Sequence, residues 1–156
     1  MPKINIAVIG GHKASPKYLK IAEELGRLIA QEGWVLVCGG REGVMEAACR
    51  GAKSAGGLTL GIMPTTNGED ANEYVDIKIP TGMGYARNFL VVRSAQAVIA
   101  VSGSYGTLSE IAFAFNDNRP VIGIGSWEIK GMIQVKSAKM AVEKTKKILK
   151  RGTNVK

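Results

Sequence analysis

The clearest potential for chemistry lies in one glycine-containing segment, SGSYGTLSE. Gly103, Ser104 and Gly106 precede Thr107, and Glu110 follows three residues later. Backbone N–H groups in such a loop, at the start of a helix, form a nest that suits an anion. The Thr107 hydroxyl could donate to a phosphate oxygen, and a nearby carboxyl group could act as a general acid or base on a sugar. The segment therefore predicts a phosphate-binding site.

Thr107 and Glu110 also fit a purely structural pattern. In the Thr-x-x-Glu capping box, the threonine side chain caps the helix and the glutamate reaches back to the threonine N–H. Spacing alone does not choose between a cap and a catalytic carboxyl group, so both interpretations stay open.

Arg87 is a second candidate for chemistry, in the segment GMGYARN. We expect a helix to begin near it and to carry the guanidinium to the same edge of the molecule as the glycine loop. There it would pair with a phosphate or with Glu110. The alternative is an arginine on the surface.

Two further glycine clusters follow apolar runs, and we expect them at the same site. Ligands of open α/β sheets bind outside the carboxyl ends of the strands, where glycine lets the backbone approach them closely. The alternative, that tight strand-to-helix turns need glycine anyway, would suffice for one loop but not for three. The lone histidine of the first cluster is either an incidental polar residue or a ligand contact. The expected ligand-binding residues of these two loops are Gly10, Gly11, His12, Gly39, Gly40 and Gly43.

Several common sites are absent from the sequence. The first loop, GGHKAS, is not G-x-G-x-x-G, and GGREGVME is not a P-loop. Cys38 and Cys49 are too few for a disulfide framework or a zinc site, and Cys38 is expected to be a small core residue. We therefore expect no metal site and no required cofactor.

Short apolar runs alternate with helical patterns along the chain. Strands that are apolar throughout are typical of a sheet covered on both faces, and their alternation with helices predicts a doubly wound, Rossmann-like α/β fold with a mainly parallel sheet. The strand at 75–80 alternates and ends at Pro80, so we expect it at an edge. The expected strands are 4–11, 34–40, 58–64, 75–80, 97–103 and 120–125, and the expected helices are 16–33, 43–53, 85–95, 107–115 and 136–151.

The length of 156 residues predicts a single domain over 1–156. No signal peptide or membrane span is expected, and with two cysteines a cytoplasmic location is predicted. The net charge of +8 lies entirely in residues 130–156, where nine basic residues accompany one glutamate. No aromatic residues interleave with these lysines, so a solvated helix face is expected rather than a nucleic-acid site.

The segment Ile111–Phe115 is apolar at five successive positions, which cover more than a full helical turn. A helix that is apolar all round is buried on more than one side. In a domain this small the second side is expected to meet a partner subunit, which predicts a homodimer or a homotetramer.

The chain resembles the LOG-like superfamily, many of whose members have carried the label lysine decarboxylase, in three successive segments: GGREGVMEAA, GMGYARN and AVIAVSGSYGTLSEIAFAF. The family's enzymes release the base of a nucleoside 5′-monophosphate and carry a P-G-G-x-G-T-x-x-E loop and an Arg-Lys pair. The resemblance implies that Glu110 and Arg87 are the catalytic residues. It implies phosphate binding by Gly103, Gly106 and Thr107.

The chain departs from that pattern at three positions. Ser102 and Ser104 replace the proline and the second glycine of the loop, and Asn88 replaces the lysine. The Ala-Arg-Asn form looks more like the molybdenum cofactor carrier subgroup, which binds a phosphorylated pterin. The resemblance therefore implies a carrier or sensor for a nucleoside monophosphate or molybdopterin-type ligand. The alternative is a phosphoribohydrolase, whereas lysine decarboxylation is not expected because no lysine is placed to form a buried Schiff base.

Overall fold

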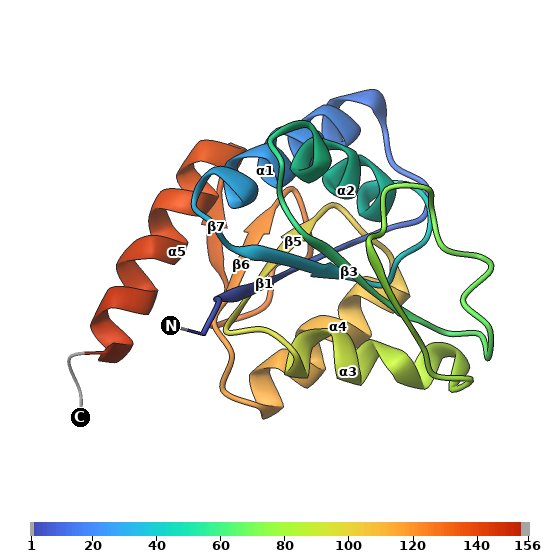
Figure 1. The fold of residues 1–156 in the computed structure, drawn as a ribbon. Coiled ribbons are helices and arrows are strands. Elements are labelled where there is room, and N and C mark those ends of the chain that lie inside the picture. Colours follow the sequence, from blue (N-terminus) through green and yellow to red (C-terminus); the bar gives the residue numbers. More distant parts are fainter. Residues whose placement is uncertain (1, 154–156) are drawn as a thin grey trace.

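A computed structural model describes residues 2–153 (Figure 1). Its seven strands form one sheet in which every pairing is parallel. The strands are β1 (Asn5–Gly10), β2 (Val35–Cys38), β3 (Thr59–Met63), β4 (Ile77–Pro80), β5 (Ala97–Val101), β6 (Val121–Ile124) and β7 (Ile133–Val135). The helices are α1 (Pro16–Gln31), α2 (Val44–Ser54), α3 (Arg87–Arg93), α4 (Tyr105–Asn116) and α5 (Ala138–Thr153), and a 3₁₀ turn, η1 (Gly84–Ala86), precedes α3.

The strand order is β4-β3-β2-β1-β5-β6-β7. The chain runs outward from β1 to one edge and then returns to the centre, where β5 pairs with the other side of β1. The order therefore reverses between β1 and β5. Loops leave this point in opposite directions and open a crevice at the carboxyl ends of the strands.

Helices cover both faces of the sheet (Figure 1). Successive side chains of a strand point to opposite faces, so alternate residues of each central strand enter different cores. Ile6 and Val8 of β1 pack on the side of α1, α2 and α5, whereas Ala7 and Ile9 pack on the side of α3 and α4. These two apolar layers confirm the doubly wound fold that continuous apolar strands predict.

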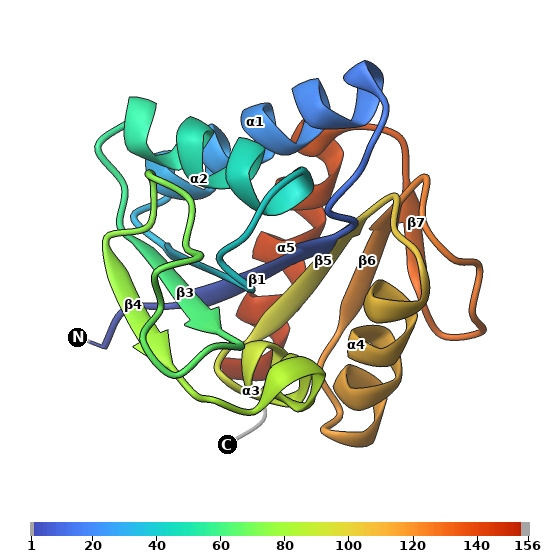
Figure 2. The ribbon, with the colours of Figure 1, turned by 90° about the vertical axis from the view of Figure 1, so that its right-hand side faces the viewer.

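The expected elements are all present, with small shifts at their ends. Strand β4 lies at an edge of the sheet, as its alternating sequence predicts (Figure 2). Helix α1 begins at Pro16 after Ser15, and Gly33 follows its end with a φ of 74°. The sequence interpretation missed β7, which forms the opposite edge. The expected single domain covers 1–156, of which residues 1 and 154–156 lie outside the described part of the chain.

Two glycines allow α1 and α2 to pack unusually close together. A Cβ on Gly26 would stand 1.9 Å from the Ala48 carbonyl oxygen, and one on Gly51 would stand 1.8 Å from the Glu23 carbonyl oxygen. Each helix thus presents a glycine to the backbone of the other. This contact fixes α2, whose first turn borders the site described below.

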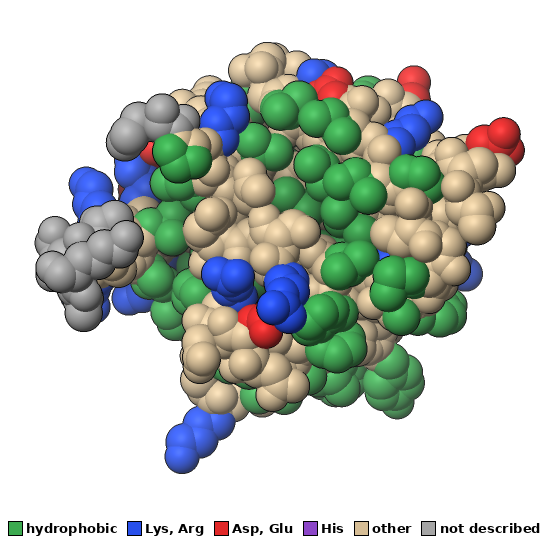
Figure 3. Space-filling view, turned by 60° about the horizontal axis from the view of Figure 1, so that its bottom comes forward, with side chains coloured by type: hydrophobic (Ala, Val, Ile, Leu, Met, Phe, Trp, Pro, Cys, Tyr) green, Lys and Arg blue, Asp and Glu red, His purple; other side chains and the backbone are tan. Residues whose placement is uncertain are grey.

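Most of the apolar side chains of α4 pack against other parts of the same chain. Ile111 and Ala114 are buried, and the Phe113 ring packs edge-to-face on Phe89 with 5.3 Å between centroids. Ala112 remains exposed. Figure 3 shows the side of the molecule on which α3 and α4 lie, where hydrophobic side chains stand among polar ones. The homo-oligomer stays a prediction.

Within residues 2–153 no helix is both long and apolar enough to cross a membrane. The basic residues of the C-terminal segment lie mostly on exposed positions of α5, and Lys146 pairs at 3.0 Å with Glu32, the C-cap residue of the neighbouring helix α1.

Candidate functional site

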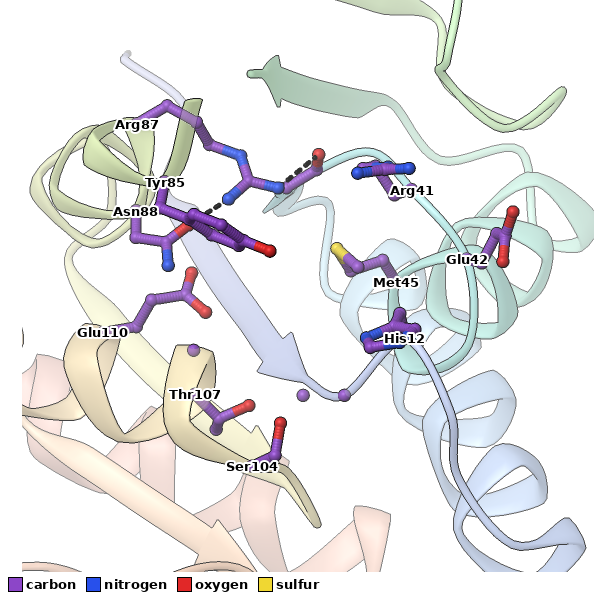
Figure 4. A pocket seen from close by; sticks show the side chains of 14 residues that line it. His12, Arg41, Glu42, Met45, Tyr85, Arg87, Asn88, Ser104, Thr107 and Glu110 are labelled. Carbon is purple, nitrogen blue, oxygen red and sulfur yellow. Dashed lines mark hydrogen bonds between the residues drawn. The ribbon is translucent and has the colours of Figure 1, made fainter. Parts of the chain in front are cut away.

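A cavity of about 220 Å³ opens at the carboxyl edge of the sheet, where the strand order reverses (Figure 4). The loops after β1 and β2, the η1–α3 segment and the first turns of α4 surround it. Its lining residues are Gly10, Gly11, His12, Gly39, Arg41, Glu42, Met45, Tyr85, Arg87, Asn88, Ser104, Gly106, Thr107 and Glu110.

The cavity brings together nine of the twelve residues expected at the site: Gly10, Gly11, His12, Gly39, Arg87, Ser104, Gly106, Thr107 and Glu110. The other three, Gly40, Gly43 and Gly103, do not line it and instead shape the loops. All three have positive φ angles, of 76°, 68° and 114° respectively, which L-residues with side chains rarely adopt.

The first turn of α4 faces the cavity without a capping side chain. The helix begins at Tyr105, and the side chain of its N-cap residue Ser104 makes no capping hydrogen bond. The first N–H groups of a helix have no partner within the helix, so those of Gly106 and Thr107 remain available to a ligand. The positive end of the helix dipole lies at the same place. The arrangement can therefore bind an anion.

The capping-box interpretation of Thr107 and Glu110 is wrong. Thr107 lies inside the helix rather than at its N-cap, so Glu110 falls in the second turn. Trp127 helps to set the earlier start, because its indole Nε1 donates to the Ser104 carbonyl at 3.0 Å and its ring contacts that of Tyr105.

Glu110 lines the cavity with only 8% of its surface exposed. No side-chain hydrogen bond or ion pair of this carboxyl group is found among residues 2–153. Burial raises the pKa of Glu110 to about 8, against the opposing effect of the Arg87 charge. The group therefore holds its proton near neutral pH and can donate a hydrogen bond or a proton into the cavity.

Arg87 is buried, with 7% of its surface exposed, so the surface alternative is wrong. Its Nε donates to the Ile62 carbonyl at 2.9 Å and its Nη2 to the Gly39 carbonyl at 3.4 Å. In the described part of the chain it forms no ion pair with Glu110. Burial lowers the pKa of Arg87, yet a guanidinium remains charged at any physiological pH. A buried positive charge thus borders the cavity.

Asn88 joins Arg87 to the first turn of α4. Its Oδ1 accepts a hydrogen bond from Nη1 of Arg87, and its Nδ2 donates to Ser109 Oγ at 3.2 Å. Ser109 Oγ in turn donates to the Gly106 carbonyl at 2.6 Å. This chain of hydrogen bonds fixes the guanidinium relative to the first turn of α4.

Five lining residues were not among the expected site residues: Arg41, Glu42, Met45, Tyr85 and Asn88. Arg41 is half exposed and lies 3.5 Å from Asp70. Arg41 directly follows Gly39 and Gly40 in the sequence, and this position could have identified it as a site residue. Tyr85 belongs to the segment GMGYARN, which pointed to the site through Arg87 alone.

Cys38 and Cys49 lie in the core, as expected for Cys38, with 3.5 Å between their Sγ atoms. Neither lines the cavity. The Cys38 sulfur accepts a hydrogen bond from the Gly40 N–H at 3.3 Å, which helps to hold the loop after β2. In residues 2–153 no cluster of three His, Cys, Asp or Glu side chains is arranged to hold a metal ion.

Comparison with known proteins gives one family match and several close structures. The model of the SLOG cluster4 family matches residues 3–153. The molybdenum cofactor binding protein of Rippkaea orientalis is 42% identical, with a TM-score of 0.91 over 96% of this chain and 99% of that one. The molybdenum cofactor carrier protein of Chlamydomonas reinhardtii is 34% identical, with a TM-score of 0.86 over 94% and 99%.

An enzyme is also among the relatives. The cytokinin riboside 5′-monophosphate phosphoribohydrolase of Mycobacterium tuberculosis is 32% identical over 126 residues, which are 73% of this chain and 67% of that protein.

Proposed function

The chain belongs to the SLOG cluster4 family, and on this premise we propose that it binds a phosphorylated nucleotide-like or pterin-like molecule in the cavity between β1 and α4, as a carrier or sensor. The ligand's phosphate lies at the first turn of α4. Its remainder extends past Arg87 and Glu110 toward the cavity mouth.

One observation carries the proposal: the uncapped first turn of α4 faces a cavity that also has a buried arginine on its border. The free N–H groups of Gly106 and Thr107 and the Thr107 hydroxyl offer hydrogen bonds to phosphate oxygens. The glycines of the β1 loop let a ligand approach the opposite backbone. Glu110 does not repel the anion, because its raised pKa keeps it protonated near neutral pH.

Two features favour binding over catalysis. The Arg87 guanidinium donates to two main-chain carbonyls and to Asn88, so few of its N–H groups remain for a reacting sugar. Asn88 stands where the resemblance places the lysine of the hydrolases. The similar structures from Rippkaea orientalis and Chlamydomonas reinhardtii, described as a molybdenum cofactor binding and a carrier protein, support a pterin-type ligand.

The second candidate is a phosphoribohydrolase, which Glu110 specifically supports. A protonated carboxyl group with a pKa of about 8 can act as a general acid near neutral pH. It would protonate the base as the N-glycosidic bond breaks and water adds to the ribose C1′, while the α4 turn holds the phosphate. The relative from Mycobacterium tuberculosis has this type of activity.

Calorimetric titration with AMP, GMP and 6-hydroxymethylpterin phosphate tests the binding proposal. We expect at least one of these compounds to bind, and Thr107→Val to weaken it by roughly tenfold or more through the loss of one hydrogen bond to a charged group. Thr145→Val is the matched control, because Thr145 is buried in α5 away from the cavity and its hydroxyl donates to Ala141. Its affinity should equal that of the wild type. Absence of binding by the wild type, or equal loss in both variants, would contradict the proposal.

Chromatography of the same AMP and GMP mixtures separates the two candidates. Carriers leave the nucleotide intact. Release of adenine or guanine by the wild type, abolished by Glu110→Gln, would establish the hydrolase instead.

A further inference from the structure

We propose that Tyr85 is the residue that recognises the planar ring of the ligand, by stacking on it at the mouth of the cavity. The inference rests on the proposed function, because it concerns the same ligand in the same cavity, and it assigns a specificity-determining residue to the end of the ligand opposite the phosphate.

Tyr85 is almost fully exposed although it lines the cavity. The residue has 87% of its surface accessible. No hydrogen bond or aromatic contact of its ring is found in the described part of the chain. Tyr105 is nearly as exposed, at 81%, but its ring has a partner in Trp127. A large aromatic side chain without a partner at a cavity mouth leaves its apolar face free for a ligand.

The exposure of Tyr85 does not reflect a loosely held backbone. The Gly82 N–H donates to the Thr65 carbonyl and the Gly84 N–H to the Pro64 carbonyl, each at 3.0 Å. The Thr81 hydroxyl donates to the Met63 carbonyl at 2.7 Å. The segment is therefore attached to the end of β3 on its N-terminal side, and α3 continues directly from it. Its backbone position is fixed, so a ligand that stacks on Tyr85 does not have to order the loop first.

The other side of the cavity offers a second wall. Figure 4 shows the Tyr85 ring extending into the cavity from the η1–α3 side, whereas Met45, Arg41 and His12 lie on the opposite side. A methionine thioether packs well against an aromatic ring, and a guanidinium stacks on one. Arg41 is half exposed with an ion pair to Asp70 that leaves part of its planar group free. A flat heterocycle fits the space between these walls.

The small volume of the cavity indicates that the planar ring of the ligand lies at the cavity mouth. Its volume of about 220 Å³ lies below the roughly 300–1,000 Å³ of typical small-molecule sites. A ligand whose phosphate occupies the α4 turn therefore extends out of the enclosed part. Tyr85 stands where that outer part emerges, and it would cover the ring.

Calorimetry with two phosphorylated probes tests the inference. AMP has both a phosphate and a planar base, whereas ribose 5-phosphate lacks the base. We expect Tyr85→Ala to weaken AMP binding by between about fivefold and about a hundredfold, the range that removal of a base-stacking aromatic residue produces. The affinity for ribose 5-phosphate should stay within twofold of the wild type. Tyr85→Phe, which keeps the ring, should restore the AMP affinity.

Met140→Ala provides the control, because it removes a large exposed side chain on α5 that does not line the cavity. Its AMP affinity should equal that of the wild type. If Tyr85→Ala leaves AMP binding unchanged, or weakens both probes equally, stacking by Tyr85 is refuted while the phosphate site stands. If the wild type binds neither AMP nor ribose 5-phosphate nor 6-hydroxymethylpterin phosphate, the proposed function itself is refuted.

Discussion

Replacing Glu110 by glutamine should change how the stability of the protein depends on pH. The carboxyl group is buried without a hydrogen-bond partner among the described residues, and burial raises the pKa of Glu110 from 4.5 to about 8. Glutamine has nearly the same shape and no charge at any pH. The wild type and Glu110→Gln therefore differ chiefly in the cost of ionising one buried carboxyl group.

The sign and size follow from the two pKa values. A group whose pKa is higher in the folded state stabilises the fold below its unfolded pKa and loses that contribution as pH rises through its folded pKa. The free energy of unfolding of the wild type should thus fall relative to Glu110→Gln between pH 4.5 and about 8. At 1.36 kcal/mol per unit the full loss is about 5 kcal/mol, of which about 3 kcal/mol falls between pH 5 and pH 7.5. That is a large fraction of the stability of an ordinary domain.

Urea titrations of both proteins from pH 5 to pH 8.5 measure this difference. Glu24→Gln is a suitable control: the hydrogen bond from Arg27 holds the pKa of Glu24 below its usual value, so that group titrates below this window. Its difference from the wild type should stay constant over the same range. A constant difference for Glu110→Gln as well would refute the account of a buried, protonated carboxyl group.

Three further substitutions test the loops and the packing that position the site. Gly103→Ala should lower the free energy of unfolding by about 2 kcal/mol or more, because φ is 114° and the new Cβ would meet the Thr107 side chain; urea unfolding at wild-type stability would contradict this. Asn88→Ala should cost about 2 kcal/mol by depriving the buried Arg87 guanidinium of a partner, and an unchanged melting temperature would show that the hydrogen-bond chain is dispensable. Gly26→Ala should cost about 3 kcal/mol through overpacking against α2; a soluble variant of unchanged melting temperature would mean that the helices separate easily.

The sequence predicts the fold well because two independent patterns indicate the central strands. Each central strand is a continuous apolar run, and a glycine cluster follows β1, β2 and β5. Strand β7 was missed because Ile133–Val135 is only three residues long. Pairing with β6 forms this strand, and a local pattern of that length does not specify it.

The candidate site was predicted in outline, but two of its features depend on contacts distant in sequence. The start of α4 depends on Trp127, which contacts Ser104 and Tyr105 from a loop more than twenty residues later. Spacing alone therefore could not decide between a cap and a buried carboxyl group at Glu110. The burial of Arg87 likewise requires carbonyl groups of two separate strand ends, which no local sequence pattern reveals.

The most direct test of the account is a titration of ¹⁵N-labelled protein with AMP and with 6-hydroxymethylpterin phosphate, followed by amide NMR spectra. The largest shifts are expected at the N–H groups of Gly11, Gly106 and Thr107, where the phosphate would lie. Shifts confined to other parts of the surface, such as the basic face of α5, or no shifts with either compound, would contradict a phosphate site at the first turn of α4.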